Sequence, residues 1–242
     1  METMIRHHNA SCAQLLQAFD VSDKDGMCQA IKGLSGALHN LKSSGSSSLR
    51  TQLLPCSCSS DSTTTIDDCI RQSPVCCPTE RACTNSGNCF IYKSAIVIPV
   101  DMNLQDSQLA NTASSIVIFN LALAHHLLAM SHDRDEAGAL VRSSLLQKAA
   151  ALYKMVYDML AMSGLVGSLF SSLAIANNLG SVYMELQEDA KAEALFDYLL
   201  SGLMVGLHAR QEDHLNLNDS LRDDYFRNIF QGAERHCPSP AA

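Results

Sequence analysis

The fold is decided by residues 173–208, which read LAIANNLGSVYMELQEDAKAEALFDYLLSGLMVGLH. Apolar residues recur at helical spacing on both sides of a short polar break, so the stretch predicts two helices joined by a turn. Gly180 in the first helix and Ala192 in the second have little or no side chain, and Phe196 follows four positions later. Small residues on facing helices let the backbones approach closely, while larger residues fill the space beside them. The stretch therefore predicts an antiparallel helical hairpin.

The composition of the whole chain also favours helices. Of its 242 residues, 47% are hydrophobic but only 5% are aromatic, and Trp is absent. Leu, Ala and Met carry the apolar load, which suits helices more than sheets. The formal net charge of -8 argues against a general nucleic-acid-binding protein. We therefore expect an all-α protein that does not bind nucleic acid.

Helical periodicity extends over most of the chain and divides it into regions. Residues 1–42 predict an N-terminal helical hairpin, and residues 90–231 predict a helical repeat domain. The expected helices span residues 10–21, 27–41, 106–131, 137–162, 169–186 and 189–207, with a capping helix over 219–231. We expect the tail, residues 232–242, to be disordered.

Two stretches between the helices have a different character. Residues 43–89 are rich in Ser, Thr and Cys and lack periodicity, so we expect a mostly disordered, flexible insert that buries too little apolar surface to offset its ordering entropy. Residues 90–100, FIYKSAIVIPV, are β-branched and aromatic and predict a strand-like arm lying against the helices. A hairpin across residues 79–100 is the alternative.

The sequence predicts a protein of the cytoplasm or nucleus that is not secreted. Residues 1–9 are polar and lack the apolar segment of a signal peptide. In a reducing compartment, free thiols are expected rather than disulfides. The uncharged run over residues 159–176 approaches the length of a membrane span, but it contains Gly164 and Gly167. It therefore predicts a helix end, a loop and a helix start, and we expect no membrane segment.

The pattern of residues 173–208 recurs twice with less fidelity. Asn178-Leu179-Gly180 is matched by Asn120-Leu121-Ala122, and half of the pattern recurs near the N-terminus at Ala18, Ala30, Leu34 and Ala37. In order and spacing, the pattern resembles the motif of the tetratricopeptide repeat family. The positions that carry the two better matches, beyond the two asparagines, are Leu121, Ala122, Ala149, Tyr153, Leu179, Gly180, Tyr183, Ala192 and Phe196. Ala192 follows Gly180 by 12 positions but Ala149 follows Ala122 by 27, so the second match requires a hairpin with about 15 extra residues.

The resemblance implies a superhelix of stacked antiparallel hairpins, each unable to bury its apolar face alone. The chain departs from the family at Ala176, where Trp is frequent, and at Leu199, where Ala is usual. In the family, the first helix of each repeat lines a groove that holds an extended peptide or a partner helix. By resemblance, Asn120 and Asn178 would bind the backbone of a protein partner. The alternative is that each Asn ties neighbouring helices together.

Catalytic and metal-binding patterns are weak in this sequence. Seven of the ten cysteines lie between Cys56 and Cys89, but their spacing is not that of paired zinc ligands. His125 and His132 can share a helix face, yet no other helix offers a matching Cys or acid. Phosphate-binding Gly loops, metalloprotease His pairs and Gly-flanked serines are absent.

We therefore expect a non-catalytic interaction or scaffold protein that uses no cofactor or metal ion. The alternative is a cysteine-based metal-binding or redox-responsive regulator that uses residues 56–89. An enzyme ranks last among the three classes.

Overall fold

The computed structural model describes residues 2–45, 91–102, 107–132, 136–162, 169–208 and 219–236. Within these ranges the chain forms seven α-helices and no strand, which confirms the all-α prediction. The helices are α1 (Glu2–Asp20), α2 (Lys24–Gly45), α4 (Ser107–Met130), α5 (Glu136–Met162), α6 (Leu169–Glu185), α7 (Asp189–His208) and α8 (Asp219–His236). The strand expected over residues 90–100 is not confirmed, since residues 91–102 carry no strand.

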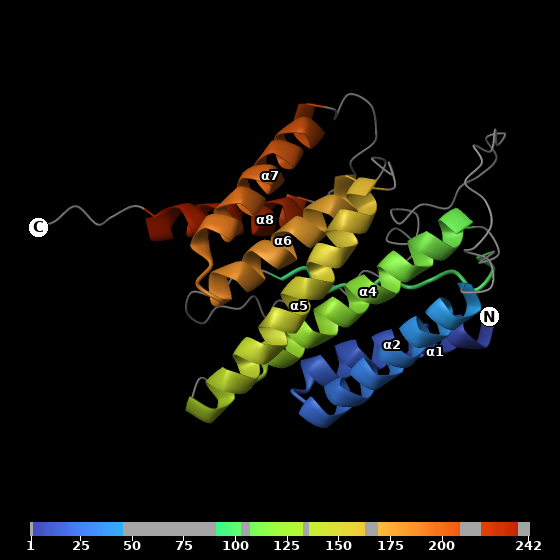
Figure 1. Ribbon diagram of the computed structural model, residues 1–242. Helices are drawn as coiled ribbons and strands as arrows, with labels where there is room; N and C mark the ends of the chain where they lie inside the picture. The colour runs from blue at the N-terminus through green and yellow to red at the C-terminus, as the bar shows by residue number, and fades with distance from the viewer. Residues whose placement is uncertain are drawn as a thin grey trace, which may run out of the picture.

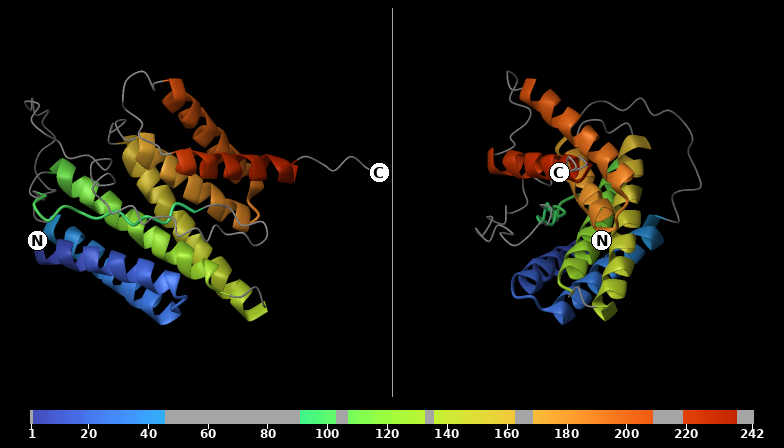
Figure 2. Two further views of the ribbon diagram at one scale, coloured as in Figure 1. Left: turned by 180° about the vertical axis from the view of Figure 1, so that it is seen from behind. Right: turned by 90° about the vertical axis from the view of Figure 1, so that its left-hand side faces the viewer.

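The described helices are arranged as consecutive antiparallel hairpins (Figure 1). Helix α1 packs on α2, α4 on α5, and α6 on α7. Contacts of α2 with α4 and of α5 with α6 join one hairpin to the next, and α8 packs against both α6 and α7. The succession of neighbouring helix pairs gives the elongated, stacked arrangement that is seen from the front in Figure 1 and from behind in the left view of Figure 2.

The apolar core of the hairpins consists of two clusters. Its largest cluster contains buried residues from α1, α2, residues 91–102, α4, α5 and α6. A second cluster at the C-terminal end joins α6, α7 and α8 around Phe196, Leu199 and Tyr225. The N-terminal hairpin, expected as a unit of its own over residues 1–42, therefore shares its core with α4.

Helix boundaries agree closely in the middle of the chain and less well at its ends. Helices α4 to α7 begin and end within one residue of the predicted positions. Helix α1 begins at Glu2 rather than near residue 10, because Met4, Ile5 and His8 extend its buried face. Helix α8 continues to His236, past the predicted end at residue 231. Most of the predicted insert, with its cysteine cluster and the possible partner strand near residue 80, lies outside the described residues.

The first and third hairpins turn in the same way. Each turn ends the first helix with a residue in the left-handed region, Ser22 with φ 58° and Gln187 with φ 60°. The paired backbone bonds of a Schellman motif close both turns. In the first turn they run from Asp23 N to Ala18 O (2.7 Å) and from Ser22 N to Phe19 O (3.0 Å), and in the second from Glu188 N to Tyr183 O (2.9 Å) and from Gln187 N to Met184 O (3.1 Å).

These matched turns give a structural register for comparing the two hairpins. Counting back from Ser22 and from Gln187, Leu15 in α1 stands where Gly180 stands in α6. The alignment of Ala18 with Gly180, drawn from the sequence, is three residues away from this register. Ala18 instead faces Gly26 of α2, where an added Cβ would lie 2.8 Å from Ala18 Cβ.

One described helix has the length and composition of a membrane span. Residues Leu109–Met130 of α4 form it, and 83% of its most apolar window is buried inside the fold. A helix in the middle of a protein core has the same length and composition. The run over residues 159–176 is divided between the end of α5 at Met162 and the start of α6 at Leu169.

Candidate functional site: an asparagine clamp on an internal arm

Residues 91–102, called the arm from here on, cross one face of the helical array. The arm runs beside α1 and α4 and reaches α6 (Figures 1 and 2). In the end-on view of Figure 2 it lies on the side of α1 and α8, away from α5. The arm therefore contacts the first helix of each hairpin.

Three asparagines, one on each of these helices, hold the arm by its backbone. In every case the side-chain oxygen accepts from the N–H, and the side-chain nitrogen donates to the C=O, of one arm residue. The pairs are Asn178 with Tyr92 (2.7 and 3.0 Å), Asn120 with Ile96 (2.9 and 2.6 Å) and Asn9 with Ile98 (3.0 and 2.8 Å). Asn9, Asn120 and Asn178 are called the amide clamp below.

The spacing of these contacts explains why the arm is held along one edge. In an extended chain the N–H and C=O of one residue point to the same side, and those of the next residue point to the other. Tyr92, Ile96 and Ile98 are an even number of positions apart, so their polar backbone groups face the same helices. A carboxamide offers one acceptor and donors side by side, so it pairs with such a residue as a neighbouring strand would. The clamp thus recognises a peptide backbone without regard to side-chain identity.

Apolar side chains of the arm complete the contact. Ile91, Tyr92, Ala95, Ile96 and Ile98 are all buried, each with 7% or less of its surface exposed. The side chains of residues 93, 94 and 97 are half-buried. The arm therefore covers an apolar surface of the helices as well as satisfying the clamp.

Asn178 is fixed in place by a network of side chains from three helices. Its Nδ2 also donates to the Tyr153 hydroxyl of α5 (3.2 Å), and its Oδ1 also accepts from Asn177 Nδ2 (3.2 Å). Asn177 Oδ1 in turn accepts from Asn228 Nδ2 of α8 (2.7 Å). Burial raises the pKa of the Tyr153 hydroxyl, which keeps it neutral. The network sets the orientation of the Asn178 amide toward the arm.

His8 of α1 plays the same part for the other two asparagines. Its Nδ1 lies 2.9 Å from Asn9 Oδ1, and its Nε2 lies 3.1 Å from Asn120 Nδ2. Because Nδ2 of an amide only donates, His8 Nε2 must accept and Nδ1 must carry the proton. Burial lowers the pKa of His8 from 6.5 to about 4, with the Asn9 contact opposing this and nearby His7 adding to it. The neutral imidazole therefore links two members of the clamp.

The sequence identified two of the three clamp residues. By resemblance, Asn120 and Asn178 were expected to bind the backbone of a protein partner, and the backbone that they bind in the structure is that of the chain's own arm. Asn178 also contacts α5, so the alternative role of tying neighbouring helices together is present as well. Asn9 was missed. The sequence pattern could not have found it, because the position of Asn178, counted from the matched turns, corresponds to Ala13, four residues after Asn9.

The residues expected to pack the repeats lie in the core. Eight of them are buried, namely Leu121, Ala122, Ala149, Tyr153, Leu179, Gly180, Ala192 and Phe196, and Tyr183 is half-buried. The two helices of the third hairpin approach closely at Gly180, where an added Cβ would lie 2.8 Å from Phe196 Cε1. Only glycine fits there without a shift of the Phe196 ring.

The other candidate groups do not assemble a reactive site within the described residues. No three His, Cys, Asp or Glu side chains come together there to hold a metal ion. Cys12 is buried beside Asn120, and burial raises the pKa of its thiol to about 12, which makes it a poor nucleophile. Burial lowers the pKa of His125 to about 4 and of His126 to about 3. The cysteines between 56 and 89 lie outside the described residues.

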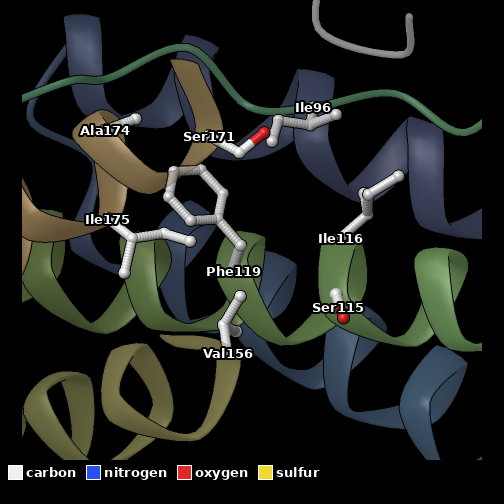
Figure 3. A pocket seen from close by; sticks show the side chains of 8 residues that line it. All are labelled: Ile96, Ser115, Ile116, Phe119, Val156, Ser171, Ala174 and Ile175. Carbon is white, nitrogen blue, oxygen red and sulfur yellow. The ribbon is translucent and has the colours of Figure 1, made fainter. Parts of the chain in front are cut away.

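A small hollow lies where the arm meets α4, α5 and α6 (Figure 3). Its lining is apolar except for two serine hydroxyls, and the Phe119 ring projects into its centre. The lining residues are Ile96, Ser115, Ile116, Phe119, Val156, Ser171, Ala174 and Ile175. No acid, base or cation lines it, so the hollow is a packing feature beneath the arm.

No family model, curated protein or solved structure matches the chain.

Proposed function

We propose that this protein is a non-catalytic interaction or scaffold protein whose helical array binds a segment of a protein partner. The observation that carries the proposal is the amide clamp, in which three asparagines on three helices pair with the backbone of one extended segment. Backbone pairing supplies affinity for any extended chain, and side-chain pockets supply selectivity.

We further propose that the array is tetratricopeptide-like. The stacking of hairpins supports this, since α1, α4 and α6 each contribute one clamp residue while α2, α5 and α7 are the second helices. The matching Schellman turns of the first and third hairpins also support it. The groove face of such an array is the face that carries the arm.

The remaining expectations stay proposals: a cytoplasmic or nuclear protein that binds neither membrane nor nucleic acid. The free thiols of buried Cys12 and exposed Cys28 favour a reducing compartment. A cysteine-based regulator remains the alternative for residues 56–89. Zinc analysis with thiol titration of the purified protein tests it, and about one zinc per chain with four protected thiols would support it.

Selection of peptides from a displayed library of random twelve-residue sequences on the full-length protein tests the main proposal. We expect enriched peptides whose binding is lost in the double variant Asn120→Ala plus Asn178→Ala. The matched control is Asn111→Ala, which removes an exposed asparagine from the same helix as Asn120. Peptides that bind the double variant as well as the wild type, with its helical circular dichroism intact, would refute the proposal.

A further inference from the structure

The arm is held in the manner of a bound peptide. The helices contact its backbone through side-chain amides, as a receptor contacts a ligand, rather than through a sheet. The helical framework is continuous without the arm, because each helix pair from α1·α2 to α7·α8 has contacts of its own. The helices therefore pair with one another independently of the arm, and the arm adds buried residues to their core cluster.

The chemistry of the arm defines what the face accepts. The clamp needs a backbone N–H and C=O at three positions on one edge, so proline at the positions of residues 92, 96 and 98 is excluded. The buried positions take Ile91, Tyr92, Ala95, Ile96 and Ile98, which are apolar and mostly β-branched. Such side chains favour an extended backbone over a helix. The face thus fits an extended apolar segment better than a partner helix.

We propose that the clamp face is a binding site for an extended, β-branched segment of another protein, and that the arm is the internal competitor which this segment displaces. This inference rests on the proposed function and adds its ligand class and its regulation. The arm is part of no described helix, since α2 ends at Gly45 and α4 begins at Ser107.

The arm competes strongly with any separate peptide, because the arm and the clamp belong to one chain. Such an intramolecular segment has an effective concentration on the order of millimolar. A free peptide with the same contacts at about 10 μM is then at roughly a hundredfold disadvantage. A natural partner must form contacts beyond those of the arm, or bind when the arm is weakened.

A fluorescein-labelled synthetic peptide of residues 90–100, titrated against the full-length protein, tests the competition by fluorescence anisotropy. The Ile98 side chain is 1% exposed, so Ile98→Ala weakens the contact of the arm with the helices. Because the arm then competes less well, the labelled peptide is expected to bind at least about tenfold more tightly. The control is Val100→Ala, on the same arm but 43% exposed, which should leave the affinity unchanged. Equal affinities for Ile98→Ala and the wild type would overturn the proposal.

Backbone recognition is tested in the peptide, where folding is not at issue. N-methylation at the position of Ile96 removes the N–H that Asn120 accepts, and binding to the Ile98→Ala variant should fall at least tenfold. N-methylation at the position of Lys93 is the control and should have little effect. Equal losses at both positions would contradict recognition through the clamp.

Hydrogen exchange on the wild-type protein supplies a readout that does not depend on any variant. At saturating peptide, the arm amides of the chain should lose protection while those of α4 and α6 keep it. The proposal is overturned if the arm amides keep their protection at saturating peptide. It is also overturned if light scattering detects a dimer in which the arm amides remain protected. Selected peptides that need Asn120 and Asn178 but leave the arm protected would refute only this inference and leave the proposed function standing.

Discussion

Acidification from about pH 7.5 to pH 5 is expected to destabilise this protein through His8. Burial lowers the pKa of His8 from 6.5 to about 4 in the folded chain. Between these two values the unfolded chain binds a proton that the folded chain does not, so stability is complete above pH 6.5 and falls as the pH decreases. Protonation would also place an N–H on Nε2 against the donor nitrogen of Asn120.

The size of the effect follows from the two pKa values. A shift from 6.5 to about 4 amounts to roughly 3 kcal/mol when the titration is complete, of which about 2 kcal/mol is lost by pH 5. His125 and His126 are lowered for the same reason, so the whole protein loses more than this. The contribution of His8 must therefore be measured as a difference between variants.

Urea unfolding of the wild type and of His8→Gln at several pH values isolates that contribution. We expect the stability of the variant to decline less between pH 7.5 and pH 5, by about 2 kcal/mol. His39→Gln is the control, because His39 is an exposed histidine on α2 and is not among the groups that shift the pKa of His8. Parallel pH curves for the wild type and His8→Gln would refute the reasoning that His8 is held neutral between two clamp residues.

Three further substitutions test the packing and the clamp by urea unfolding. Asn120→Ala strands the buried N–H and C=O of the arm residue it binds and should cost about 2–4 kcal/mol, whereas Asn111→Ala, on the exposed face of α4, should change stability by less than about 0.5 kcal/mol. Gly180→Ala places a Cβ 2.8 Å from the Phe196 ring and should lower the free energy of unfolding by about 1–3 kcal/mol. Gly36→Ala has no heavy atom within 4 Å of its added Cβ and should instead raise the free energy of unfolding by up to about 1 kcal/mol. Gln187→Gly relieves a left-handed residue with φ 60° and should stabilise the turn by about 0.5–1 kcal/mol. A loss in Asn111→Ala as large as that in Asn120→Ala, a penalty at Gly36, or a destabilised Gln187→Gly would each contradict the contacts described.

The amide clamp also explains why the arm belongs to the array as a whole. Its three members come from α1, α4 and α6, and His8 connects the members on α1 and α4. The arm therefore contacts all three hairpins through hydrogen bonds to its backbone.

Much of the fold could be predicted from local sequence. The boundaries of α4 to α7 follow from apolar periodicity and polar breaks, which are properties of neighbouring residues. The close approach at Gly180 was also expected, because a small residue followed by a correctly spaced aromatic is a local pattern. The start of α1 was missed because the first nine residues include several polar ones. One of them, His8, is buried only through its contact with α4 in the folded chain.

The sequence by itself determined that this protein is all-α and where its central helices begin and end. A role for Asn120 and Asn178 in holding an extended backbone was implied only by the resemblance. Only the tertiary structure decided what they hold. Tyr92 lies 86 positions before Asn178, and Ile98 lies 89 positions after Asn9. An amide pairs with whichever backbone the folded chain brings to it, and that depends on the path of residues 91–102 across three helices. Periodicity is a local property, whereas this path is fixed by the apolar surface that the assembled helices leave for the arm to cover.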